Sequence, residues 1–409
     1  MELPFKYHLP RTGLLVAALL LAGCCPPAQN SCKPTPNSGS ATFALSNYPK
    51  SGVPRSMFRE AHSALLTQPL IGVGDRIGFP LDGGVKLTHV DALEHGVPLN
   101  SVAVWITKDV QPDWVPAEAL ERAAADGVTP VFLMYYFAAE NSSEDAQEHR
   151  YDWYQYLAEF AAHVSGETPV VILLEPEIND MGAEANGKEP LMYWPGLQEM
   201  LMDGLYIVRT IAPNAVVGIC FGDFGPEELE PWFGEAVAYS DVVAFQEMRA
   251  STRNADLDPS GKELAQQVLE TTKRLHRSFD KPVLLAYLAM SSYQEDGGPE
   301  WTQIQALAIQ EILGNFKALH AEGLWGMLYF QLRDDPNHVG FFKEAEVDFG
   351  LLDELGNPKP AMDAFRQGAE AILYQTPVSE WGNTCNPPAP QPEPEPQPEP
   401  TPEPDVIDN

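Results

Sequence analysis

Two glutamates end an apolar stretch in segment 169–180, whose sequence is PVVILLEPEIND. A run of branched aliphatic residues is typical of a buried strand, and strand residues two apart share a face, so Glu175 and Glu177 are expected to point the same way. In a parallel barrel, the C-terminal end of such a strand lies at the mouth. A carboxylic acid there could donate a proton to a glycosidic oxygen. The neighbouring carboxylate could share that site or raise the pKa of the first.

Repeated strand and helix units should position these glutamates. Short apolar runs alternate with longer helical patterns from Ser101 onward, which is typical of βα units around a parallel sheet. We predict strands at 101–107, 130–137, 170–177, 215–221, 241–247, 282–289 and 325–332. We predict helices at 117–125, 151–164, 192–211, 262–279 and 304–321.

An eighth strand is needed to close a barrel, and segment 70–77, followed by a weak helix at 88–94, is the best place for it. The expected fold class is therefore α/β, a (β/α)8 TIM barrel. The alternatives are a seven-stranded distorted barrel and an open doubly wound sheet. No Gly-x-Gly-x-x-Gly or Gly-Lys-Ser/Thr loop follows any strand, so a nucleotide-binding open sheet loses its usual support.

The expected rim combines aromatic, amide and acidic side chains, which suits a carbohydrate because sugar ring faces stack on aromatics while hydroxyls need donors and acceptors. Arg249 and Arg333 alone offer fixed positive charge at the strand ends, which disfavours phosphate ligands. No cysteine or histidine spacing indicates a metal, and no cofactor is expected. The candidate substrate-binding residues are Trp105, Tyr135, Tyr136, Asn179, Tyr287, Tyr329, Gln331 and Asp335.

The formal net charge of -33 argues against nucleic acid or an anionic membrane surface as a partner, because both reward lysine and arginine. A neutral polysaccharide or oligosaccharide fits better. A disulfide between Cys32 and Cys385 would join the two ends of the domain, whereas Cys220 lies in an apolar strand and is expected to be a buried thiol.

The N-terminal sequence resembles a bacterial lipoprotein signal peptide: Lys6 and Arg11 precede an apolar run that ends in Leu-Ala-Gly-Cys at Cys24. The resemblance implies cleavage before Cys24, acylation of that cysteine with palmitate and anchoring in the cell envelope. An ordinary secretory signal cut nearby is the alternative. Cys25, rather than aspartate, follows the lipobox and favours the outer membrane over the inner. We thus divide the chain into signal 1–23, tether 24–42, barrel 43–384 and a disordered Pro/Glu-rich tail 385–409.

The order of elements resembles the large clan of retaining glycoside hydrolases built on (β/α)8 barrels. More narrowly, segments 129–136 and 170–180 are similar to the third and fourth strands of the mannanase-type family 26 enzymes. That pattern ends its fourth strand in His-Glu-Met-Asn, which Pro176-Glu177-Ile178-Asn179 matches at glutamate and asparagine but not at histidine. The resemblance implies that Glu177 is the acid/base.

The seventh strand departs from the clan, which places a nucleophilic glutamate there. The corresponding run, 284–289, is LLAYLA and has no carboxylate. Glu247 is the nearest substitute, with Glu175 and Asp334 or Asp335 behind it. Glu175, Glu177 and Glu247 could instead be structural, paired with Arg249, Arg333 or tyrosine hydroxyls.

Three functions stay open: a lipid-anchored glycoside hydrolase, a non-catalytic carbohydrate-binding barrel that lacks the nucleophile, and a surface lipoprotein that is a scaffold for protein partners.

Overall fold

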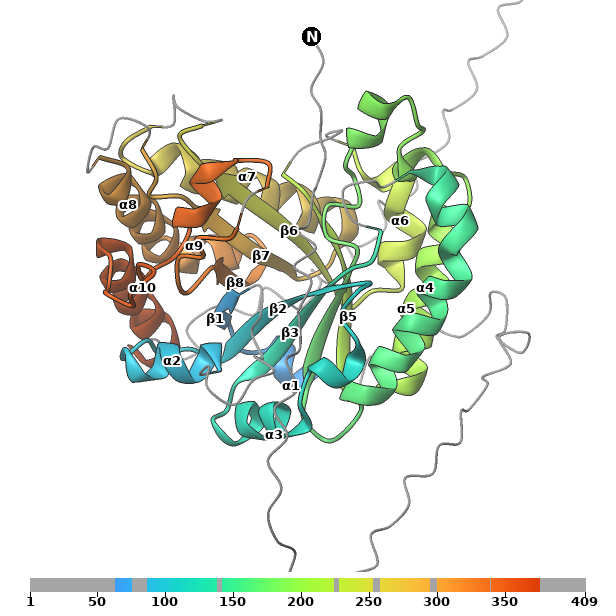
Figure 1. Cartoon of the computed structure of the whole chain (residues 1–409), viewed down its shortest axis with the longest axis horizontal. Coiled ribbons are helices and arrows are strands. Elements are labelled where there is room, and N and C mark those ends of the chain that lie inside the picture. Colours follow the sequence, from blue (N-terminus) through green and yellow to red (C-terminus); the bar gives the residue numbers. More distant parts are fainter. Residues whose placement is uncertain are drawn as a thin grey trace, which may run out of the picture. The chain divides into compact units, whose positions relative to one another are not determined.

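The computed structural model describes residues 63–75, 87–137, 142–223, 228–252, 258–294, 300–338 and 340–375. Within them, eight parallel strands close into a barrel in chain order, with helices around the outside (Figure 1). The (β/α)8 prediction is therefore confirmed, and the seven-stranded and open-sheet alternatives are wrong. The strands are β1 (Leu70–Asp75), β2 (Ser101–Thr107), β3 (Thr129–Tyr135), β4 (Val170–Leu174), β5 (Ala215–Phe221), β6 (Val242–Arg249), β7 (Val283–Met290) and β8 (Leu324–Phe330).

The predicted first strand is confirmed as β1, which pairs with both β2 and β8. Glycine is required within it: a Cβ on Gly72 would lie 2.2 Å from the carbonyl oxygen of Ser101 in β2. The sequence signal was weak because glycines that allow this close approach also interrupt the apolar pattern.

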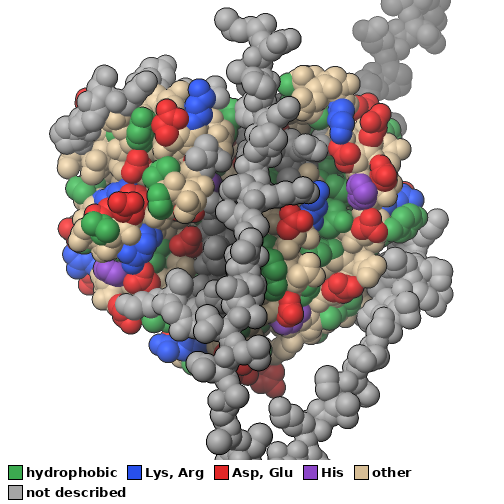
Figure 2. All heavy atoms as spheres, viewed as in Figure 1, with side chains coloured by type: hydrophobic (Ala, Val, Ile, Leu, Met, Phe, Trp, Pro, Cys, Tyr) green, Lys and Arg blue, Asp and Glu red, His purple; other side chains and the backbone are tan. Residues whose placement is uncertain are grey.

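The helices lie outside the barrel, and acidic side chains are spread over the face in view, with fewer basic ones between them (Figure 2). Within the described residues, no helix is long and apolar enough to cross a membrane. The helices are α1 (Ser63–Leu66), α2 (Thr88–Glu94), α3 (Ala117–Ala125), α4 (Ser143–Val164), α5 (Leu197–Ile211), α6 (Glu230–Ala238), α7 (Lys262–Phe279), α8 (Glu300–Gly314), α9 (Phe316–Ala321) and α10 (Pro360–Glu370).

Three helices differ from prediction. The helix expected at 304–321 begins at Glu300 and is divided into α8 and α9. α4 begins at Ser143 rather than at residue 151, because the Ser142 hydroxyl caps it by accepting a hydrogen bond from the Asp145 amide at 3.2 Å. The helix expected at 192–211 begins at Leu197, after a separate 3-10 turn, η6 (Leu191–Tyr193).

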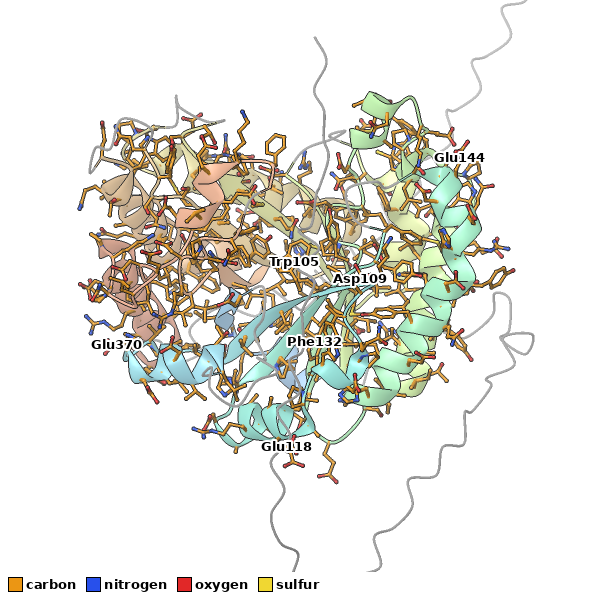
Figure 3. All side chains as sticks on the ribbon, in the orientation of Figure 1. Trp105, Asp109, Glu118, Phe132, Glu144 and Glu370 are labelled. Carbon is orange, nitrogen blue, oxygen red and sulfur yellow. The ribbon has the colours of Figure 1, made fainter. Side chains whose placement is uncertain are left out.

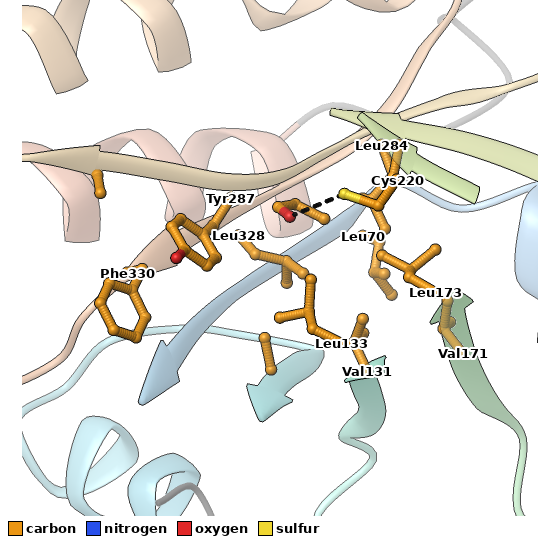
Figure 4. Close-up of a cluster of buried hydrophobic side chains, with 14 of the residues drawn as sticks. Leu70, Val131, Leu133, Val171, Leu173, Cys220, Leu284, Tyr287, Leu328 and Phe330 are labelled. Atoms are coloured by element: carbon orange, nitrogen blue, oxygen red, sulfur yellow. Dashed lines mark hydrogen bonds between the residues drawn. The ribbon is translucent and has the colours of Figure 1, made fainter. Parts of the chain in front are cut away.

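The core has two layers because the strand side chains alternate between the barrel interior and the helices. On the outer face, Phe132 of β3 packs against Phe160 of α4 with ring centroids 5.0 Å apart; Figure 3 labels Phe132. The interior is filled by aliphatic side chains such as Val131, Leu173 and Leu328 (Figure 4). Cys220 is also buried there as a free thiol.

Several sequence predictions fall outside the described residues. They are the signal peptide, the Cys24 lipidation site, the tether, the Pro/Glu-rich tail, and the pairing of Cys32 with Cys385.

Candidate functional site

The chain leaves strand conformation at the first of the two glutamates. β4 ends at Leu174, and both Glu175 and Glu177 have left-handed backbone conformations, with φ of 45° and 63°. The strand expected to continue to residue 177 therefore stops three residues earlier, and the alternation on which we based a shared face does not hold there. The two carboxylates have different partners as a result.

Glu175 is completely buried, and its partners belong to helix α4 and to the residues that follow β3. Its carboxylate accepts hydrogen bonds from the Trp153 indole of α4 at 2.6 Å and from the amides of Phe137 and Tyr136 at 3.1 and 3.4 Å. Burial raises the pKa of Glu175 to about 8, although these three hydrogen bonds act in the opposite direction. This carboxyl group joins α4 to the end of β3, which is the structural alternative considered above.

We expect Glu175→Gln to destabilise the fold by about 1–3 kcal/mol, because the new NH2 group would face the Phe137 amide, also a donor. The folded-state pKa of Glu175 is raised, so its contribution to stability is complete below pH 4.5 and is lost as the pH rises through about 8. The difference between variant and wild type should therefore shrink with rising pH. Urea unfolding of both proteins at pH 4.5 and 8.5 measures this difference in stability. Glu159→Gln, on the exposed face of α4, is the control. A loss of stability in Glu175→Gln no larger than that in Glu159→Gln would contradict the prediction.

Glu177 is half-buried at the mouth and accepts a hydrogen bond from the Tyr135 hydroxyl at 3.0 Å. Burial raises the pKa of Glu177 to about 7, and the negative charges of Asp180, Asp223 and Glu346 add to that effect. The group therefore keeps its proton up to neutral pH. This is the protonation state that a general acid needs.

Tyr135, which binds Glu177, is one of four aromatic rings in mutual contact, and we call Trp105, Tyr135, Tyr287 and Phe330 the aromatic floor. The Trp105 ring meets Tyr135 edge to face at 4.9 Å and Tyr287 at 5.6 Å, and Tyr287 stacks on Phe330 at 4.6 Å. Figure 3 places Trp105 near the middle of the barrel, and Figure 4 shows Tyr287 beside Phe330. Gly74 of β1 lies next to the Phe330 ring, and a Cβ at this position would be 3.6 Å from that ring.

Tyr287 lies on β7, the strand at whose end the retaining glycoside hydrolases that this chain resembles have a carboxylate. Burial raises the pKa of the Tyr287 phenol well above its ordinary value, and the charges of Glu177 and Glu346 raise it further. The hydroxyl is therefore neutral over the physiological range, so β7 brings a phenol and no negative charge to the mouth.

Glu247 belongs to an ion cluster with Asp223 and Arg249. The Arg249 guanidinium contacts both carboxylates, and it also donates to the Gln267 side chain of α7 at 2.8 Å. Burial and the charge of Asp223 raise the pKa of Glu247 well above its usual range, while Arg249 opposes that shift. The predicted salt-bridge alternative for Glu247 is thus present in the structure.

The remaining predicted binding residues have varied positions. Tyr136 packs against Tyr156 of α4 at 5.5 Å, and Asn179 binds the Gly222 backbone at 2.7 Å. The Tyr329 hydroxyl is buried and donates to the carbonyls of Met290 and Phe349 at 2.9 and 3.1 Å.

Two more of these residues follow β8. The Gln331 amide is completely buried and has no hydrogen-bond partner among the residues described. Asp335 lies in the loop, where its carboxylate accepts from the Asn337 amide at 2.9 Å.

Sequence reasoning missed Glu346. It lies in a 3-10 helix, η7 (Glu344–Asp348), between β8 and α10, yet its charge acts on both Glu177 and Tyr287. An inspection of strand ends cannot find it, because the residue is far from the end of its strand. Among the described residues, no group of three or more histidine, cysteine, aspartate or glutamate side chains could hold a metal ion.

Comparisons with known proteins identify similar folds but assign the chain to no family. No family model and no curated protein matches the chain. Among solved structures, GH5_18 from Streptomyces cattleya in complex with GlcNAc has a TM-score of 0.56 and 15% identity, covering 76% of this chain and 82% of that one. A GH5_18 from Bifidobacterium longum subsp. infantis has a TM-score of 0.56 and 17% identity, with coverages of 75% and 79%.

A thermostable mutant of a xylanase (Xyn10A) from Cellvibrio japonicus has a TM-score of 0.51 and 15% identity, covering 75% of this chain and 99% of that one. At these identities the likeness concerns the fold alone. The chain folds as the closed parallel barrel that glycoside hydrolases use.

Proposed function

We propose that this protein is a glycoside hydrolase that acts on a β-linked polysaccharide or oligosaccharide, with Glu177 as its proton donor. One observation carries the proposal: a half-buried carboxyl group with a pKa of about 7 lies at the end of β4, hydrogen-bonded to Tyr135 and next to the aromatic floor. An acid of this kind can protonate a leaving oxygen at neutral pH.

The chemistry is a hydrolysis. A sugar ring packs its C–H face on the aromatic floor, and Glu177 gives its proton to the glycosidic oxygen. The bond between the anomeric carbon and that oxygen breaks, and its electron pair goes to the oxygen. Water then adds its hydroxyl to the anomeric carbon, and its second proton restores the acid.

The ligand class has two further supports. The Streptomyces cattleya and Bifidobacterium longum subsp. longum GH5_18 proteins were solved as variants in complex with Manb1-4GlcNAc, a β-linked disaccharide. The acidic protein surface also fits a neutral sugar better than an anionic one (Figure 2). The resemblance of segments 129–136 and 170–180 to mannanase-type family 26 adds mannans to the candidates.

We also propose that the barrel is attached to the bacterial cell envelope through lipid on Cys24, on the outer membrane rather than the inner. Only the N-terminal sequence supports this location. A polysaccharide at or near the cell surface would then be within reach of the mouth.

The test is reducing-end release by the purified chain from mannans, glucans, xylans and galactans. Release from one of these classes would support the proposal. Binding to one of them without product would contradict it and would favour the second candidate, a non-catalytic carbohydrate-binding barrel. The observation behind that candidate is Tyr287, a neutral phenol at the β7 position where the clan has its nucleophile.

A further inference from the structure

We propose that Glu346 is the second catalytic carboxylate of this site, facing the anomeric carbon from the side of the mouth opposite Glu177. The inference rests on the proposed hydrolase function and deepens it. In this arrangement Glu177 protonates the leaving oxygen, and the negative charge of Glu346 stabilises the positive charge that develops at the anomeric carbon.

The position of η7 in the barrel supports this role for Glu346. In a closed barrel of eight strands, β4 and β8 are four places apart in either direction and therefore lie opposite each other. Glu177 follows β4, whereas Glu346 follows β8, the neighbour of β7. Glycoside cleavage uses two carboxyl groups that flank the scissile bond, and residues after opposite strands can lie on two sides of a bound sugar.

Two hydrogen bonds fix η7 against the strand ends. The Ser291 hydroxyl, just after β7, donates to the Ala345 carbonyl at 2.6 Å, and the Asp335 amide donates to the Val347 carbonyl at 3.2 Å. Ala345 also belongs to the same buried cluster as Tyr287 and Phe330 of the aromatic floor. These contacts hold the loop at the end of β7, where a strand carboxylate is missing.

Glu346 is only 3% exposed, and both of its carboxylate oxygens have partners. One oxygen accepts a hydrogen bond from the Phe342 amide at 2.7 Å, and the other lies 3.0 Å from Nε2 of His338. A Cβ on Gly340 would come within 2.5 Å of the second oxygen, so glycine leaves room for it. The Phe342 amide and the His338 ring therefore hold the carboxylate in one orientation.

The other acidic candidates are engaged elsewhere. Glu175 accepts three hydrogen bonds on the α4 side, and Glu247 and Asp223 share Arg249. Glu346 is different because its charge acts on two groups at the mouth, the Glu177 carboxyl and the Tyr287 phenol, and raises the pKa of each. The His338 ring beside Glu346 lies 5.7 Å from the Phe330 ring of the aromatic floor, which places the Glu346 carboxylate next to that floor.

The experiment compares Glu346→Ala and Glu346→Gln with Glu344→Gln, an exposed residue of the same 3-10 helix. The probes are 2,4-dinitrophenyl β-glycosides of glucose, mannose, xylose, galactose and N-acetylglucosamine, whose leaving group departs without protonation. We expect both Glu346 variants to lose about 10²–10⁴-fold in turnover, while Glu344→Gln keeps it. Added formate or azide should restore turnover to Glu346→Ala only, since a small anion replaces the missing carboxylate.

Retained turnover in both Glu346 variants would overturn the inference and leave the proposed function standing. Loss of turnover without rescue, together with a lowered melting temperature, would also overturn it, because Glu346 would then be a structural residue of its loop. A wild-type protein without activity on any glycoside or polysaccharide would instead refute the proposed function itself.

Discussion

Glu177→Gln should reduce polysaccharide hydrolysis by about 10²–10⁴-fold, the usual contribution of a general acid. Glutamine keeps the size of the side chain and its contact with Tyr135, but it has no proton to give. On a 2,4-dinitrophenyl glycoside the loss in the first step should be much smaller, because that leaving group needs no acid. The measurement is kcat/KM of both proteins on both types of substrate.

The pH dependence gives the same prediction a second check. Glu177 must be protonated to act and its pKa is about 7, so wild-type kcat/KM should fall as the pH rises through about 7. This alkaline decline should be absent from the residual activity of Glu177→Gln. Glu199→Gln, on the exposed side of α5, is the matched control and should leave the profile unchanged. Undiminished polysaccharide hydrolysis by Glu177→Gln would show that the proton comes from another group.

Arg249→Met should have the largest effect on stability, a loss of about 3–5 kcal/mol near pH 8. Arg249 is the cation recorded between Glu247, whose side chain is 2% exposed, and Asp223, whose side chain is 19% exposed. Its removal leaves two carboxylates close together with little access to water. The pKa of Glu247 would rise further, so the loss should diminish as the pH is lowered and that carboxylate takes up a proton.

Urea unfolding at pH 8 and pH 5 measures this effect. Arg277→Met is the control on α7, since Arg277 is 73% exposed and lies 3.9 Å from Glu322; that change should cost less than about 1 kcal/mol. The double variant Arg249→Met, Glu247→Leu should recover part of the stability because one buried charge is removed with its partner. A single variant as stable as the control would show that the ion cluster contributes nothing to the fold.

The predictions for the barrel succeeded where the physical cause is local. The strand at 170–174 was recognisable because both of its faces are buried, which requires an unbroken run of apolar residues. Trp105, Tyr135 and Tyr287 were found as a group for a similar reason: parallel strands bring their C-terminal ends to one rim, so residue order along the chain gives neighbourhood in space.

The predictions failed where a change in backbone conformation or a partner distant in the chain determines the position of a side chain. Glu175 and Glu177 diverge because both adopt left-handed backbone conformations, which strand periodicity cannot anticipate. Tyr329 looked like a residue of the rim, but its side chain is turned toward the outer helices: Gln305 of α8 donates to its hydroxyl at 3.0 Å, and its ring lies 6.1 Å from Phe365 of α10.

By itself, the sequence determined the parallel barrel and placed two glutamates just after its fourth strand, because burial and strand order follow from the local pattern of apolar residues. The tertiary structure decided which partners each carboxylate has. Arg249 draws Glu247 into an ion cluster, and contacts of Ser291 and Asp335 with η7 hold the loop that carries Glu346 against the ends of β7 and β8. Such contacts join residues far apart in the chain, and no spacing in the sequence records them.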